Sequence, residues 1–151
     1  MDYKLVEKKL AELNYIISIS EPDSDAFQDA SQKMDEILFE NINIREFSFI
    51  GKHIDGEITL EMEAKMIVAA AEGKPLTAVV PLSANDEAAY KIRRARIAQN
   101  ISQVELAQKA GMTQSQIAKV ENAQMNLTLD VVQRIMSVLG DTFLIKPIEI
   151  A

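Results

Sequence analysis

The chain has 151 residues, of which 48% are hydrophobic and 26% charged, a composition ordinary for a globular protein of one or two small domains. It contains no cysteine and a single histidine, His53, which excludes a disulfide framework, a thiolate metal site and a multi-histidine metal site. The first ten residues lack the apolar core of a signal peptide, and the longest apolar run, residues 66–71, is far shorter than the roughly 20 residues that span a bilayer, so a cytoplasmic protein with no membrane partner is expected.

The net charge of −7 is distributed unevenly along the chain. Residues 1–84 contain 8 Lys and Arg against 16 Asp and Glu, whereas residues 85–151 contain 8 against 7. The acidic excess therefore belongs to the first half. This asymmetry predicts two modules with different partners, and only the second avoids strong repulsion from the phosphates of a nucleic acid.

The first half is predicted to be a small acidic α+β domain over residues 1–74. Residues 5–13 and 25–40 carry apolar side chains at helical spacing, which predicts a helix in each segment. Asp25 and Gln28 suit the N-cap and N3 positions of the second helix.

Two strands are expected to complete this domain. Residues 57–63 alternate polar and apolar side chains, which predicts a strand with one buried face. Asp55-Gly56 immediately before it suits a hairpin turn, with residues 47–53 as the partner strand. Residues 64–72 fit either a continuation of the strand or a helix.

The second half is predicted to be an all-α domain over residues 85–151, joined to the first by an extended linker at residues 75–84 that contains two prolines. Beyond the linker the apolar spacing is helical in four short segments, which are residues 85–98, 102–110, 113–122 and 128–139. Residues 142–150 are β-prone and predict a C-terminal strand.

Two capping boxes fix the starts of the second and third of these helices. In each box an N-cap hydroxyl is followed three residues later by a side chain that can return the hydrogen bond: Ser102 with Glu105, and Thr113 with Gln116. Gly111 between them suits the left-handed residue that ends a helix. The spacing therefore predicts two helices joined by a tight turn.

Residues 92–140 resemble the helix-turn-helix domain of the Xre family, which includes the lambdoid phage repressors and Cro. The resemblance rests on Arg96-Ile97, Gln103, Leu106-Ala107, Gly111, Thr113-Gln114-Ser115 and Glu121. It implies a lambda-repressor-like fold, a sequence-specific transcriptional repressor, and a structural ion pair between Arg96 and Glu121. The chain departs from the family pattern at Ala123, where the family often has glycine, so the turn there is expected to differ in shape.

The resemblance also implies the contacts with double-stranded DNA, because the second helix of the motif enters the major groove with its first residues against the base edges. The expected base-reading residues are Gln114, Ser115, Gln116 and Lys119, with Gln114 foremost because its amide can pair with adenine N6 and N7. The expected phosphate contacts are Gln103, Thr113, Asn122, Arg93 and Arg94. The two arginines and Lys91 fit a merely solvated helix equally well.

A homodimer on a palindromic operator is expected, since one such domain reads too few bases to be selective. The C-terminal strand has two interpretations. It pairs with its counterpart in the dimer, as similar strands do in several Xre-type antitoxins, or it joins the edge of the sheet in its own N-terminal domain, with Pro147 at an edge position.

Two hypotheses account for the acidic half. In the first it binds a basic toxin, as HigA-type antitoxins do, with Glu57, Glu61 and Glu63 among the complementary charges. In the second the protein is a stand-alone regulator whose first half dimerises or senses a small ligand. The same carboxylates also fit an ordinary solvated surface.

The sequence argues against an enzyme. His53, the one histidine that could activate a serine, lies at the tip of the predicted hairpin, and the chain has no glycine-rich phosphate loop. Glu61 and Glu63 would share one strand face but lack a third metal ligand. Neither a metal nor a cofactor is predicted.

Overall fold

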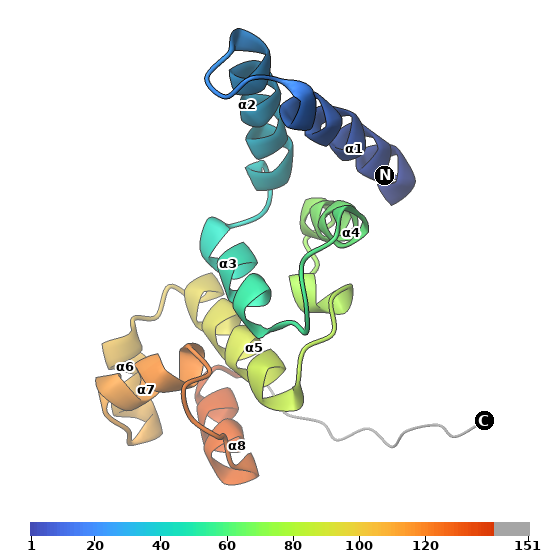
Figure 1. Ribbon diagram of the computed structural model, residues 1–151. Coiled ribbons are helices and arrows are strands. Elements are labelled where there is room, and N and C mark those ends of the chain that lie inside the picture. The colour runs from blue at the N-terminus through green and yellow to red at the C-terminus, as the bar shows by residue number, and fades with distance from the viewer. Residues whose placement is uncertain (141–151) are drawn as a thin grey trace, which may run out of the picture. The chain divides into compact units, whose positions relative to one another are not determined.

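The computed structural model describes residues 1–140, which divide into two compact units, one formed by residues 1–82 and one beginning at Ser83. Every regular element of the described residues is a helix, as Figure 1 shows. None of these helices combines the length and the apolar character that crossing a membrane requires.

The first unit contains four α-helices and one short 3-10 helix. These are α1 (Tyr3–Ile19), α2 (Asp25–Phe39), α3 (Ile44–His53), α4 (Leu60–Ala71) and η1 (Leu76–Ala78). Helix α1 packs against both α2 and α4, and α4 also contacts η1. The core of this unit includes the fully buried side chains of Leu10, Ile50, Met66 and Val80.

The predicted α+β fold of the first half is wrong, because residues 57–63 form no strand. Thr59 is instead the N-cap of α4, and its hydroxyl accepts a hydrogen bond from the backbone N–H of Met62 at 3.2 Å. The residues that follow, 64–71, are rich in alanine and bury one face of a helix. Glu61 and Glu63 lie in its first turn, where the positive end of the helix dipole favours carboxylates. The segment left open between strand and helix is therefore helical.

The predicted partner strand, residues 47–53, is also wrong and lies in α3. Asn43 caps this helix, because its side-chain oxygen accepts from the backbone N–H of Arg45 at 2.9 Å. Asp55-Gly56 connects α3 to α4, and Gly56 adopts φ 86°. The predicted hairpin turn is therefore wrong as well, because these residues form a bend between two helices.

The two helices expected in the first half are present with different bounds. Helix α1 continues beyond the predicted end at Leu13 to Ile19. Helix α2 is capped by Ser24 rather than Asp25, since the Ser24 hydroxyl accepts from the backbone N–H of Phe27. Residues 75–82, for which the sequence predicts an extended linker, contain η1 and belong to the first unit, where Leu76 is 1% exposed.

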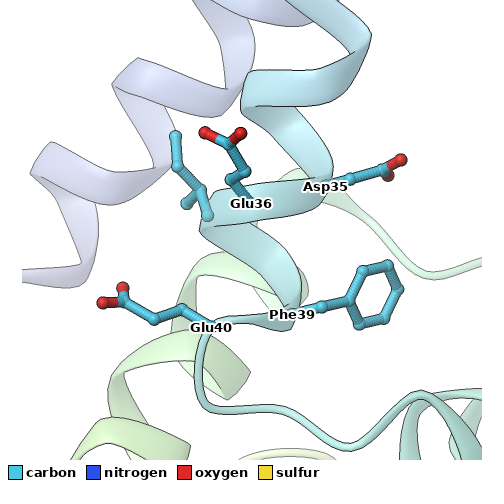
Figure 2. Close-up of a pocket in the computed structure, with 5 residues that line it drawn as sticks. Asp35, Glu36, Phe39 and Glu40 are labelled. Carbon is cyan, nitrogen blue, oxygen red and sulfur yellow. The ribbon is translucent and has the colours of Figure 1, made fainter.

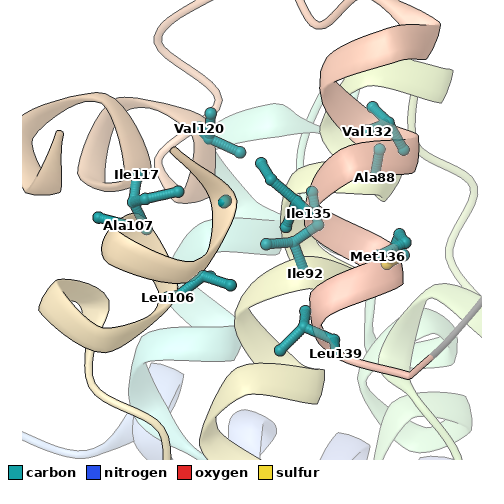
Figure 3. Packing of buried hydrophobic residues seen from close by; sticks show 11 residues of the cluster. Ala88, Ile92, Leu106, Ala107, Ile117, Val120, Val132, Ile135, Met136 and Leu139 are labelled. Carbon is teal, nitrogen blue, oxygen red and sulfur yellow. The ribbon is translucent and has the colours of Figure 1, made fainter. Parts of the chain in front are cut away.

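The second unit has helices at the four predicted places: α5 (Ala84–Ala98), α6 (Gln103–Ala110), α7 (Gln114–Glu121) and α8 (Leu129–Val138). Their apolar faces meet in one core, drawn in Figure 3. Its labelled members are Ala88 and Ile92 from α5, Leu106 and Ala107 from α6, Ile117 and Val120 from α7, and Val132, Ile135, Met136 and Leu139 from α8 and its C-cap. The predicted C-terminal strand, residues 142–150, lies outside the described residues.

Candidate nucleic-acid interface

The connection between α6 and α7 is a tight turn held by backbone and side-chain hydrogen bonds. Both predicted capping boxes are formed, at Ser102 with Glu105 and at Thr113 with Gln116. Gly111 ends α6 in the left-handed conformation, with φ 66° and ψ 36°. The N–H of Met112 then donates to the carbonyl of Ala107 at 2.9 Å. These local interactions fix the angle at which α7 leaves α6.

A chain of hydrogen bonds runs from the surface of α7 into the interior of the unit. Gln114 Nε2 donates to Gln103 Oε1 at 2.8 Å. Gln103 Nε2 in turn donates to Glu121 Oε2 at 3.0 Å. The first residue of α7 is therefore tied, through the first residue of α6, to the last residue of α7.

Glu121 anchors this chain because it is buried in an ion pair with Arg96. Its side chain is 1% exposed and that of Arg96 is 13% exposed. Arg96 donates from Nε to Glu121 Oε1 and from Nη2 to Oε2 at 3.0 Å, and its Nη1 donates to the carbonyl of Ile101 at 2.8 Å. With Gln103 the carboxylate accepts three hydrogen bonds, which offset much of the cost of removing its charge from water.

The side chains expected to read bases are exposed on α7. Gln114, Ser115, Gln116 and Lys119 are all exposed. Gln116 is also committed to its capping box, since its Oε1 accepts from the backbone N–H of Thr113 at 2.9 Å. Gln114, Ser115 and Gln116 occupy the first turn, and Lys119 follows one turn later.

The residues expected to contact phosphates are more scattered. Gln103 and Thr113 lie at the starts of α6 and α7, near the exposed side chains just described. Asn122 is exposed at the other end of α7, about 12 Å along the helix axis from Gln114. Arg93 and Arg94 are partly buried on α5. The bond from Gln114 to Gln103 thus brings the two helix starts together, whereas Asn122 lies at the other end of α7 and the two arginines lie on a different helix.

A family model for helix-turn-helix domains matches residues 92–142, a segment that contains α6, α7 and α8 and the second half of α5. The match spans about a third of the chain, and this segment is similar to helix-turn-helix domains of the Xre type. Domains of this kind bind DNA in transcription regulators. A search of curated proteins and a search of solved structures each give no match to the chain.

Two side chains that sequence reasoning missed hold the helix-turn-helix domain together. Asn85 Oδ1 accepts from the backbone N–H of Leu127 at 2.7 Å, and its Nδ2 donates to the carbonyl of Met125 at 3.3 Å. Gln99 Nε2 donates to the carbonyl of Leu139 at 2.6 Å. Asn85 thereby fixes the loop before α8, and Gln99 fixes the end of α8. No local pattern signals either residue, because each partner lies about 40 positions away in the sequence.

The turn after α7 contains the residue at which the sequence departs from the family pattern. Ala123 adopts φ 52°, a left-handed conformation that residues other than glycine rarely take. The backbone N–H of Gln124 then donates to the carbonyl of Lys119 at 2.9 Å, which closes the helix end. Ala123 therefore occupies, at some cost in strain, a position that suits glycine.

The acidic side chains predicted to bind a partner differ in their surroundings. Glu57 is exposed before α4. Glu61 pairs with Lys65 at 2.6 Å, and this hydrogen bond lowers the pKa of Glu61. Partial burial raises the pKa of Glu63. Because Glu61 and Glu63 are two apart on a helix, they do not face each other.

His53, predicted to lie at a hairpin tip, lies in a helix instead. It is the last residue of α3, where its Nδ1 lies 2.8 Å from the carbonyl oxygen of Phe49 and its ring stacks on the Phe49 ring. Within residues 1–140 no group of three or more His, Cys, Asp or Glu side chains is arranged to hold a metal ion.

Proposed function

We propose that the protein is a sequence-specific transcriptional repressor that reads a palindromic operator, as a homodimer, with the first turn of α7. The observation that carries this proposal is the hydrogen bond by which Gln103 holds the Gln114 side chain in place. One hydrogen of its amide group is used by Gln103, which leaves the second hydrogen and Oε1 for the bidentate pattern of adenine N7 and N6. A side chain held in this way loses little rotamer freedom on binding.

The other expected contacts follow from the same docking geometry. Ser115 and Lys119 extend the exposed face of α7 along the groove, and Gln116 contributes where its capping bond allows. Gln103 and Thr113 lie at helix starts, where unpaired backbone N–H groups and the helix dipole favour a phosphate. Asn122, Arg93 and Arg94 are assigned to phosphates farther from the base edges.

A homodimer on a two-fold symmetric operator would give the protein enough selectivity between DNA sites. One α7 helix reaches only a few base pairs, and each mismatched pair costs about 1–3 kcal/mol. A single domain therefore discriminates weakly against the many other sites of a genome. Two domains on half-sites about one helical turn apart multiply this discrimination.

The test begins by enriching bound duplexes from a random DNA pool and sequencing them. The Gln114→Ala variant is then compared with the unmodified protein on the enriched duplex and on random DNA. The enriched duplex should be bound about 5- to 150-fold more weakly, with random DNA nearly unaffected, because only the base contact is lost. Gln133→Ala, which removes an exposed glutamine of α8, is the control and should change neither affinity. Equal losses on both DNAs would show that Gln114 does not read bases.

A second candidate function is that the first unit binds a basic protein such as a toxin, which would make the chain an antitoxin that also represses its own operon. The charge of residues 1–82 favours it, with 8 Lys and Arg against 16 Asp and Glu. The end of α2 also carries an open depression of about 690 Å³, lined by Asp35, Glu36, Ile37, Phe39 and Glu40. Figure 2 shows carboxylates on both sides of this part of the helix.

Two triple variants test this second function. Asp35→Asn, Glu36→Gln and Glu40→Gln remove the charges of the depression, and Glu57→Gln, Glu61→Gln and Glu63→Gln remove those first predicted to bind the partner. The tagged full-length chain is purified at native expression level and its stoichiometric companions are identified by mass spectrometry. A small basic companion that one triple variant loses and the other retains would support binding by the first unit. Recovery of the chain alone would contradict it and favour a stand-alone regulator.

A further inference from the structure

Helix α1 has an apolar outer face that nothing in the first unit covers. Leu10 and Leu13 pack inward and are 0% and 4% exposed. On the other side of the helix Leu5, Tyr15 and Ile19 are 68%, 64% and 63% exposed. Large apolar side chains left in water along one helix stripe mark a surface that gains free energy when it is covered.

The spacing of this outer face is that of a coiled-coil seam. The exposed residues Leu5, Lys8, Glu12, Tyr15 and Ile19 of α1 follow one another at alternating intervals of three and four residues. This is the a and d pattern of a heptad repeat, in which two helices pack side by side. The central layers, Lys8 and Glu12, are charged and of opposite sign. We refer to these five residues as the α1 seam.

We propose that the α1 seam binds the α1 seam of a second copy of this chain in antiparallel orientation. An antiparallel pair places a positions opposite d positions. With the two-fold axis at the level of Leu10, Leu5 lies opposite Tyr15 of the second copy. The same axis places Lys8 opposite Glu12 of the second copy, and each of these contacts occurs twice.

The charges of the seam select both the orientation and the partner. A parallel pair in register would place Lys8 against Lys8 and Glu12 against Glu12, which repel each other. A basic protein is also disfavoured here, because α1 carries Lys4, Lys8 and Lys9 against only two glutamates, unlike the acidic unit to which it belongs. A second copy of the chain satisfies both charges of the seam at once.

The experiment measures the mass of the full chain in solution without DNA, by sedimentation over a range of concentrations. The unmodified protein should reach twice the chain mass of 16.8 kDa. Lys8→Glu alone and Glu12→Lys alone should each raise the dissociation constant of the dimer about tenfold or more, because both ion pairs become repulsive. Lys52→Glu, a charge reversal at an exposed residue of α3, should leave the dimer unchanged.

Mixing the two single variants separates a contact between chains from an effect within one helix, since Lys8 and Glu12 are also neighbours on the same α1. One variant then has an acidic side chain at both seam positions, and the other has a basic side chain at both. In a mixed dimer every charged layer pairs an acidic side chain with a basic one, so the equimolar mixture should dimerise as tightly as the unmodified protein. The double variant that carries both reversals should do the same.

Three results would overturn the proposal: an unmodified protein that is monomeric at every concentration, single variants that dimerise as tightly as the unmodified protein, or a mixture that fails to restore the dimer. Circular dichroism of the single variants checks that they keep their helix content. Because no DNA is present, failure here leaves base reading by Gln114 untouched, and failure of base reading leaves this dimer untouched.

Discussion

Glu121 is a charged side chain buried within the described residues, 1–140. Its removal should therefore lower the free energy of unfolding. Glu121→Ala leaves Arg96 partly buried without its counter-charge and Gln103 without its acceptor. We expect the free energy of unfolding to fall by about 3–5 kcal/mol, measured by urea denaturation. Asp130→Ala, which breaks the exposed pair with Arg134 on α8, is the matched control and should have little effect. Similar losses in both variants would contradict a structural role for the buried pair.

Substitution of Ala123, the left-handed residue after α7, should stabilise the protein rather than destabilise it. Ala123→Gly removes the steric strain of φ 52°, worth about 1–2 kcal/mol, and adds freedom to the unfolded chain, worth about 0.4–1 kcal/mol. We therefore expect a net stabilisation of about 0.5–1 kcal/mol, seen as a higher melting temperature. Asn100→Gly, at another left-handed residue with φ 54°, should stabilise less because asparagine tolerates this conformation. A lower melting temperature for Ala123→Gly would show that the turn is unstrained.

Between elements, the bond from Gln114 to Gln103 joins the starts of α6 and α7, and a double-mutant cycle measures what it contributes to reading DNA. Gln103→Ala and Gln114→Ala together should lose less operator affinity than the two losses added, with a coupling of about 0.5–1.5 kcal/mol. The reason is that a released Gln114 already reads adenine poorly. The same cycle on random DNA, and a cycle of Gln103 with Gln133 on the operator, should both be additive. If the affinity losses of Gln103→Ala and Gln114→Ala also add on the operator, Gln103 does not position Gln114.

The elements of the second unit were predictable because several local signals agree there. Hydroxyl caps, their reciprocating side chains and Gly111 all specify the same helix ends. In the first unit the signals conflict. The alternation around Ile58 spans only three apolar positions and repeats with the period of a strand, while the cap at Thr59 and the alanine-rich run after it specify a helix. Propensity and packing over the longer segment decided the outcome.

The candidate site shows a similar division between local and distant contacts. The exposed turn of α7 follows from its capping box and was predictable from neighbouring residues. The bond from Gln103 to Glu121 joins residues 18 positions apart, and that from Asn85 to Leu127 joins residues 42 apart. Such contacts depend on how helices pack, and spacing along one helix contains no information about them.

In the whole molecule, the acidic charge and the DNA-binding elements lie in different units. Residues 1–82 hold 8 Lys and Arg against 16 Asp and Glu, whereas residues 83–140 hold 7 against 5. At least three of these seven cations form ion pairs: Lys91 with Glu87, Arg96 with Glu121 and Arg134 with Asp130. The described part of the DNA-binding unit therefore has few cations for phosphate contacts, so the proposed repressor must gain much of its operator affinity from hydrogen bonds to bases.

The salt dependence of DNA binding measures this directly. At most four cations per copy lie outside these ion pairs, so a dimer can neutralise at most about eight phosphates with them. The logarithm of the association constant should then fall with the logarithm of salt concentration with a slope no steeper than about −7. Lys119→Gln should make the slope shallower by about 2, one contact in each half-site, if this lysine reaches a phosphate, and should leave it unchanged if it meets only base edges. Fluorescence anisotropy titrations of the operator at several salt concentrations give the slope. A steeper slope in the unmodified protein would show that cations of the first unit or beyond residue 140 also contact DNA, and that charge contributes more of the affinity than the helix-turn-helix domain alone can supply.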